Sequence, residues 1–278
     1  NISFKGYNNF SSFTEQYLEE LVSDKADTNA ALSNYIFGSS LAFRTYLIDT
    51  SNNSSGVWDG YQSMVPISTG VNQYYNQITR GGIHEIAIGL AGNMDDRLYI
   101  GGSLNFPVVS FRKNLNYSET DATNNTNNDF NYFKYREESS SSGFGFGAKF
   151  GIIYKPSESW RLGFAFHTPQ IIHFKDKIRA WLDTDTEGYA GKRSESSDNL
   201  NSGNAGMRDY NLTTPLKAIV SASFVFREVE NTKRQRAFIS ADLEYVNYGG
   251  ARFSVVDEED VAAKNYLKLV LKFKLSRA

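Results

Sequence analysis

The chain has 278 residues, a formal net charge of -2 and no cysteine. This charge gives no electrostatic case for nucleic-acid binding, and the lack of cysteine excludes a disulfide framework and a thiolate metal site. Aromatic residues make up 14% of the chain although the mean hydropathy is only -0.44. No apolar run approaches the roughly 18 residues of a transmembrane helix, whereas strands that expose every second side chain to lipid remain compatible with this composition.

Residues 14–36 have a helical composition and follow a capping pattern in which Ser11 or Ser12 precedes Glu15. We therefore expect a helical extracellular element there, outside the bilayer. The next apolar run has period two, which predicts a strand. Its apolar members are Leu41, Phe43 and Leu47, opposite Arg44 and Tyr46.

A first hairpin is predicted on either side of the polar segment 92–96, because every second residue is apolar before and after it. The apolar face comprises Ile86, Ile88, Leu90, Leu98, Ile100, Leu104 and Phe106, and the opposite face Glu85, Ala87, Gly89, Arg97, Tyr99, Gly101, Ser103 and Asn105.

Residues 143–169 predict a second hairpin, interrupted by a short polar turn at 155–159. One face is mostly phenylalanine, and the other is glycine, lysine and arginine. We expect the phenylalanine face to meet lipid, with Tyr154 and Trp160 at the membrane boundary near a periplasmic turn. The glycines would face inward, where small residues leave room for a plug or a ligand.

Further alternating runs cover 216–226, 237–245 and 267–275, and the first two flank a polar turn at 227–236. The acidic run 256–260 lacks the spacing and the glycine of an EF-hand, so we expect a solvated helix start there.

The connections between these runs differ strongly in length. The breaks at 92–96 and 155–159 are short, whereas the long ones are polar and in part expected to be strand beyond the membrane; they cover 49–83, 107–142 and 169–215. Short turns at one end and long polar loops at the other are typical of an all-β, antiparallel transmembrane β-barrel of the outer-membrane type. The alternative is a soluble β-sandwich, whose turns are usually more even in length.

Charged side chains fall on the polar face of the predicted strands. They are Arg44, Glu85, Arg97, Lys149, Arg161, His167, Lys217, Asp242 and Glu244. A charge on the lipid face at the bilayer midplane would cost about 2–4 kcal/mol, so these residues should face the barrel interior. Because both signs are present, we expect ion pairs that brace a filled or narrow barrel rather than an ion-selective ring.

No pattern in the sequence predicts an enzyme. The three histidines, His84, His167 and His173, lack zinc-site spacing, and we interpret His167 as structural. The glycines of 143–147 belong to a strand rather than to a dinucleotide fingerprint, and no G-x-S-x-G elbow is present. We expect no catalytic, metal-binding or cofactor-binding residue and no cofactor, and the sequence assigns no ligand-binding residue.

Five segments, in order along the chain, resemble the FadL/TodX family of outer-membrane transporters of long-chain fatty acids and other hydrophobic compounds. They are residues 80–85, 96–104, 145–156, 160–169 and 239–248, and the resemblance covers most of 35–250. It implies a 14-stranded barrel in the Gram-negative outer membrane, plugged by an N-terminal hatch. A hydrophobic ligand would be caught outside and released sideways through the wall, and outer-membrane lipid and lipopolysaccharide would surround the barrel.

The chain departs from that family pattern. About ten strands are predicted, the Asn-Pro-Ala segment of the hatch is not visible, and the chain begins at Asn1 without a signal peptide. We therefore interpret residues 1–278 as a single barrel domain from a longer or processed protein.

Transport sets a limit on affinity, because burying an acyl chain of roughly sixteen carbons would yield about 12 kcal/mol. A passive transporter must bind only part of such a chain or weaken the site by a conformational change. A second hypothesis is an accessory subunit of an outer-membrane protein-secretion complex that docks an envelope protein partner. A third is a soluble β-sandwich binding module.

Overall fold

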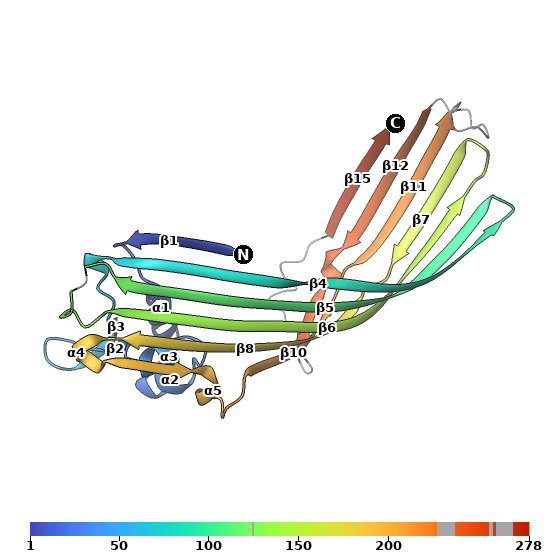
Figure 1. Ribbon diagram of the computed structural model, residues 1–278. Helices are drawn as coiled ribbons and strands as arrows, with labels where there is room; N and C mark the ends of the chain where they lie inside the picture. The colour runs from blue at the N-terminus through green and yellow to red at the C-terminus, as the bar shows by residue number, and fades with distance from the viewer. Residues whose placement is uncertain (124, 227–236, 256–257, 260–268, 278) are drawn as a thin grey trace. The chain divides into compact units, whose positions relative to one another are not determined.

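The computed structural model describes residues 1–123, 125–226, 237–255, 258–259 and 269–277 (Figure 1). These residues form mostly antiparallel β-sheet, so the predicted all-β class is confirmed. Within this part of the chain no helix is both long and apolar enough to cross a membrane.

The chain divides into two compact units. Unit 1 comprises 1–81, 111–141 and 176–208, and unit 2 comprises 82–110, 142–175 and 209–278. Three long strands contribute residues to both units: β4 (Val71–Met94), β5 (Leu98–Asp121) and β6 (Tyr132–Tyr154). Much of the predicted long connections is therefore strand, as expected.

The remaining strands are shorter. They are β1 (Ile2–Asn8), β2 (Ile48–Asn52), β3 (Trp58–Ser63), β7 (Trp160–His167), β8 (Ile171–Asp185), β9 (Lys192–Ser196), β10 (Gly206–Thr213), β11 (Leu216–Phe226), β12 (Ala237–Asn247), β13 (Arg252–Val255), β14 (Glu258–Glu259) and β15 (Leu269–Arg277). The helices are α1 (Glu15–Ser23), α2 (Thr28–Ser33), α3 (Ser39–Arg44), α4 (Glu187–Ala190) and α5 (Ser197–Leu200), with 3-10 turns η1 (Ile67–Thr69) and η3 (Tyr248–Gly250).

The N-terminal predictions need two corrections. Helices α1 and α2 lie within the predicted 14–36, but the expected strand over 41–47 is helix α3 and its C-terminal turn. Leu41 and Leu47 are fully buried in the helical core, and this tertiary packing decides the conformation of so short a run. Arg44 therefore lies on a helix, where its Nε donates to the carbonyl of Leu32 at 2.8 Å.

The predicted cap of the first helix is also wrong. Helix α1 begins after Thr14, which makes no side-chain cap hydrogen bond. The hydroxyl of Ser12 donates to Glu119 at 2.5 Å and accepts from Thr14 N at 3.2 Å, so the backbone donor that it satisfies is that of the residue before the helix.

Two C-terminal predictions fall partly or wholly outside the described residues. In the acidic run 256–260, Glu258–Glu259 form strand β14 rather than a helix start, and the other three residues lie outside the described part. The predicted turn 227–236 and residues 267–268 of the last run lie outside it as well.

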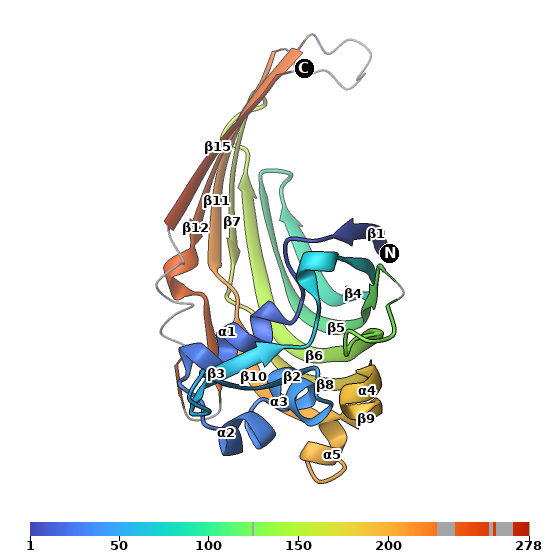
Figure 2. The same cartoon turned by 90° about the vertical axis from the view of Figure 1, so that its left-hand side faces the viewer.

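Unit 1 has its own hydrophobic core, formed by the helices, the β2–β3 hairpin and the odd-numbered side chains of β5 and β6. Figure 2 shows helices α1–α3 beside the β2–β3 hairpin. Phe13 stacks on Tyr117 with ring centroids 4.5 Å apart, and its ring also meets the edge of Tyr17 at 5.6 Å. The fully buried members include Leu21, Leu41, Leu47, Ile48, Phe130, Phe133 and Leu182. The N-terminal segment is thus held against the sheet by aromatic packing.

A buried carboxylate fixes the start of this segment. Glu119 has no exposed surface, and it accepts hydrogen bonds from Phe13 N at 2.9 Å, Gln73 Nε2 at 2.8 Å and Tyr117 Oη at 2.7 Å, besides that from Ser12. Burial, together with the Glu119 charge, raises the pKa of Tyr117, so its hydroxyl stays protonated and keeps donating. Four donors satisfy the carboxylate, as a buried charge requires.

Unit 2 is a single antiparallel sheet in which β7 pairs with β6 and β11, and β12 lies between β11 and β15. The predicted short turn between β4 and β5 is confirmed. Asp95 and Asp96 both have positive φ, 52° and 53°, as a type I′ hairpin turn requires.

Threonine side chains accept hydrogen bonds from backbone N–H groups of the sheet where prolines interrupt its strands. Pro169 separates β7 from β8, and Pro215 separates β10 from β11. Thr168 Oγ1 accepts from Ala148 N at 2.9 Å, and Thr214 Oγ1 accepts from Gln170 N at 2.8 Å. These bonds satisfy backbone donors that the interrupted ladder would leave unpaired.

We predict that Glu119→Ala lowers the free energy of unfolding by about 3 kcal/mol, because it leaves buried donors of Ser12, Gln73 and Tyr117 without an acceptor. Denaturant titration measures this change. Glu19→Ala, at an exposed position of α1, is the control and should stay within about 0.5 kcal/mol. Equal effects of the two substitutions would show that Glu119 does not anchor the segment.

Candidate functional site

The outward face of β6 changes its chemistry part-way along the strand. In unit 1 its even-numbered residues are polar: Lys134, Arg136, Glu138 and Ser140. In unit 2 the same face carries Phe144, Phe146, Phe150 and Ile152, each between 42% and 59% exposed. Successive even-numbered residues lie on one face of a strand. The reversal therefore means that the surroundings of this face change along the strand, and not that the side chains turn to the other face.

The same reversal occurs on the neighbouring strand β5, at the same boundary between the units. Leu98, Ile100 and Leu104 lie on this face in unit 2, and Arg112, Asn114 and Asn116 continue it in unit 1. We call the apolar part of this face the apolar band; its exposed members are Ile86, Ile88, Leu90, Ile100, Leu104, Phe144, Phe146, Phe150, Ile152, Leu162, Phe164, Val220 and Leu243. So large an exposed apolar surface marks a membrane or protein contact.

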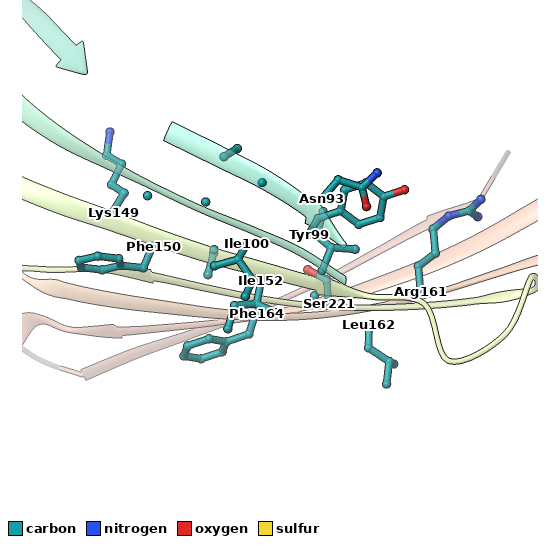
Figure 3. A pocket seen from close by; sticks show the side chains of 18 of the residues that line it. Asn93, Tyr99, Ile100, Lys149, Phe150, Ile152, Arg161, Leu162, Phe164 and Ser221 are labelled. Carbon is teal, nitrogen blue, oxygen red and sulfur yellow. The ribbon is translucent and has the colours of Figure 1, made fainter. Parts of the chain in front are cut away.

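The opposite face of unit 2 holds a hollow of about 1000 Å³. Six neighbouring strands, β4, β5, β6, β7, β11 and β12, line it mainly with glycine, alanine and serine. Its larger polar side chains are Asn93, Tyr99, Lys149, Arg161 and Asp242. Figure 3 shows Lys149 and Arg161 on one side of the ribbon and Phe150, Leu162 and Phe164 on the other. Six members of the apolar band also contribute to the lining of the hollow: Leu90, Ile100, Phe150, Ile152, Leu162 and Phe164.

Ion pairs cross this polar face, as the mixed charges predict. Lys149 Nζ lies 2.5 Å from Glu85 Oε1, which also accepts from the amide of Asn105, and Lys217 Nζ lies 2.7 Å from Glu244 Oε2. These side chains are about one quarter to one third exposed, so in water each pair would contribute only about 0–1 kcal/mol. Their main effect is to fix side-chain positions beside the hollow.

The structure brings together most of the charged residues that the sequence places on the polar face. His167 pairs in register with both Lys149 and Lys217, so it lies between the two ion pairs. Arg161 and Asp242 line the hollow, and Arg97 lies at the β4–β5 turn. Arg44 is the exception, because it belongs to helix α3.

The glycines of β6 have two different roles, which the sequence does not separate. A Cβ at Gly145 would lie 2.5 Å from the Ile171 carbonyl oxygen, and one at Gly147 would lie 2.5 Å from Gln170 Cγ. Gly145 therefore allows close approach of the β8 backbone, and Gly147 allows close approach of the Gln170 side chain. Neither glycine leaves room for a ligand, contrary to expectation. At Gly151, by contrast, the nearest atom to a Cβ is 3.8 Å away, so this glycine does leave space.

Sequence reasoning missed Asn93 and Tyr99 as site residues. Asn93 lies in the segment taken as a turn, whereas β4 continues through it to Met94, and Tyr99 carries an aromatic ring on the polar face. Asn93 has an odd number, like Glu85 and Gly89 on the polar face of the same strand, and this pattern could have placed it in the site. In the described part of the chain, no cluster of three or more histidine, aspartate or glutamate side chains could hold a metal ion.

Comparison with known proteins adds no family. No family model matches the chain, and neither a curated protein nor a solved structure matches it. The resemblance to the FadL/TodX family thus depends on the five sequence segments alone.

We predict that Gly145→Ala destabilises the protein by about 2–3 kcal/mol, because the added Cβ meets backbone atoms of β8 that cannot move independently. Gly151→Ala, on the same face of the same strand, should be neutral or slightly stabilising. Denaturant titration of both variants measures the free energy of unfolding. Equal tolerance at the two positions would contradict the close approach of β8.

Proposed function

We propose that unit 2 is part of the wall of a 14-stranded β-barrel in the Gram-negative outer membrane, and that the protein takes up hydrophobic small molecules, such as long-chain fatty acids. The observation that carries this proposal is the reversal of one face of β5 and β6 from polar to apolar. A lipid environment around unit 2 and water around unit 1 explain that reversal with no further assumption.

Strand lengths support this assignment. The apolar face of β6 extends from Phe144 to Tyr154, and β11 and β12 each have 11 residues. A tilted strand needs about 9–11 residues to cross the hydrocarbon core. Tyr154 and Trp160, 48% and 46% exposed, flank the β6–β7 turn, where interfacial aromatics belong in a spanning hairpin.

The open edge of unit 2 also favours a longer wall. Among the described strands, residues 78–94 of β4 pair only with β5, since β1 covers no more than residues 71–77. A long apolar edge strand is a site of aggregation unless another strand pairs with it. Barrel closure removes such edges, and further strands beside β4 and β15 would complete the wall.

The hollow is the proposed ligand position. Its small side chains expose backbone and leave space for a narrow apolar chain, while Lys149 and Arg161 provide positive charge for an acidic end. Because the hollow is open, it would bury only part of a long chain. Partial burial keeps binding weak enough for release, which a passive transporter requires.

We predict that Leu104→Arg prevents stable insertion of the protein into phosphatidylcholine vesicles, because it places a charge within the apolar band at a cost of about 2–4 kcal/mol. Asn116→Arg lies on the same face of β5, but in unit 1, and should insert normally. Flotation of refolded protein with vesicles measures insertion. If both variants insert equally well, the band does not face lipid.

We predict that Gly151→Leu reduces uptake of a fluorescent long-chain fatty acid at least tenfold, because the side chain enters the hollow. Ala148→Leu adds the same side chain to the opposite face of β6 and should leave uptake unchanged. The assay is uptake into vesicles that contain each variant at equal density. Normal uptake by the Gly151→Leu variant would show that the fatty acid does not pass through the hollow.

A second candidate function is docking of an envelope protein within a secretion complex. It is favoured by exposed apolar side chains on unit 1, where Phe10 is 88% exposed and Trp58 is 50% exposed. Purification of the protein from envelope membranes distinguishes docking from transport. The docking function would replace the transport proposal if a stoichiometric partner copurifies with the wild-type protein, is lost from Phe10→Ser/Trp58→Ser, and the wild-type protein takes up no fatty acid.

A further inference from the structure

A pocket of about 510 Å³ lies on the outward face of unit 1, where strands β1, β4 and β5 are neighbours in the sheet (Figure 1). Its volume is within the range of roughly 300–1,000 Å³ that is usual for small-molecule sites. The lining includes Lys5, Tyr7, Asn72, Tyr74, Ser118 and Thr120, all of which belong to unit 1. We call this space and these six residues the tyrosine pocket.

The ring of Tyr7 is held in one position although it is 60% exposed. Tyr7 is opposite Asn72 in the register of β1 and β4. Its ring packs directly on Gly70, where an added Cβ would overlap it, and its hydroxyl donates to the carbonyl of Thr69 at 3.4 Å. An exposed ring that is already fixed offers a surface on which a ligand can stack with little further loss of side-chain entropy.

Lys5 brings a positive charge to the pocket. It is opposite Tyr74 in register, and its Nζ lies 5.1 Å from the centroid of the Tyr74 ring. No acidic residue is among those that line the pocket, and no described carboxylate forms an ion pair with Lys5. A cation–π contact positions an ammonium group but does not neutralise it, so its N–H donors can still bind an anion.

The next strand, β6, repeats this arrangement beside the pocket. Asp121 N donates to the carbonyl of Asn131 at 2.9 Å, which sets the register of β5 and β6. Antiparallel pairing then places Tyr132 beside Thr120, and Lys134 beside the preceding outward residue of β5. Lys134 Nζ lies 5.0 Å from the centroid of the Tyr132 ring, and no described carboxylate forms an ion pair with it. Two lysine–tyrosine pairs therefore flank the polar floor of the pocket.

The side chains between the two pairs match the chemistry of a sugar. The amide of Asn72 and the hydroxyls of Ser118 and Thr120 can both donate and accept hydrogen bonds, as sugar hydroxyls do. The C–H face of a sugar ring can stack on a tyrosine, and the ammonium groups complement a carboxylate. Single-stranded nucleic acid also stacks on aromatic rings, but its sites depend on a strongly basic groove, whereas this chain has a formal net charge of -2.

We propose that the tyrosine pocket binds an acidic saccharide, such as a chain of uronic acid units. Its sugar rings stack on Tyr7 and Tyr74, and its carboxylates lie near Lys5 and Lys134. This ligand needs no acyl chain, and the inference does not depend on the membrane position of unit 2. It adds a polar ligand, bound by unit 1 alone, to a protein whose proposed cargo is hydrophobic.

The test is isothermal titration calorimetry of the full protein with three lipid-free probes: a galacturonic acid hexamer, the neutral maltohexaose, and a thymidine hexanucleotide. We expect the galacturonic acid hexamer to bind about tenfold more tightly than maltohexaose in dilute buffer, and this preference to weaken in about 0.5 M salt. Lys5→Gln/Lys134→Gln should abolish the preference, and Tyr7→Ala/Tyr74→Ala should weaken the binding of both saccharides. Lys25→Gln/Lys192→Gln removes the same charge from exposed positions of unit 1 outside the pocket and should retain the preference. Circular dichroism of each variant checks that it is folded.

Three results would overturn the inference. The first is equal affinity for the acidic and the neutral saccharide, or an unchanged preference in Lys5→Gln/Lys134→Gln. The second is tighter binding of the hexanucleotide than of the galacturonic acid hexamer, because the pocket would then be a nucleic-acid site. The third is the absence of binding by any probe. Vesicle insertion and fatty-acid uptake, which test the proposed function, should be unaffected in all of these variants.

Discussion

The alternation of side chains along a β-strand is the constraint on which this structure depends. An extended strand must present every second residue to the same side. Where the surroundings of that side change along the strand, the polarity of these side chains must change at the same residue. Strands β5 and β6 meet this requirement at one boundary, with polar outward side chains in unit 1 and apolar ones in unit 2. The inward side chains change in the opposite sense, from the aromatic core around Phe133 to glycines, serines and ion pairs.

This double reversal explains why each unit is stabilised differently. Unit 1 buries its inward face under helices α1–α3 and the buried Glu119, as a water-soluble domain does. In unit 2 the largest exposed side chains lie on the outward face, so hydrophobic burial within the unit cannot account for them. In the proposed membrane position, lipid covers the apolar band and the inward hollow stays open for a ligand.

Local pattern was sufficient to predict some features. The alternation in 85–106 and 143–166 predicts both hairpins, and the mixed charges predict pairs such as Glu85–Lys149. Other features depend on distant contacts. Helix α3 replaces an expected strand because Leu41 and Leu47 pack in the helical core, and Glu119 meets Ser12 across 107 positions of sequence. Gly145 and Gly151 share parity and composition, and only the position of β8 shows that their roles differ.

The most direct test of the membrane assignment is an accessibility scan along the outward face of β6. The chain has no cysteine, so single cysteines can be placed at even positions from 134 to 154 and spin-labelled without a background. In lipid vesicles, labels at 144–152 should relax faster with oxygen than with a water-soluble nickel complex, and labels at 134–140 should show the reverse. Preferential access of the nickel complex at every position would contradict the account, because the apolar band would then face water.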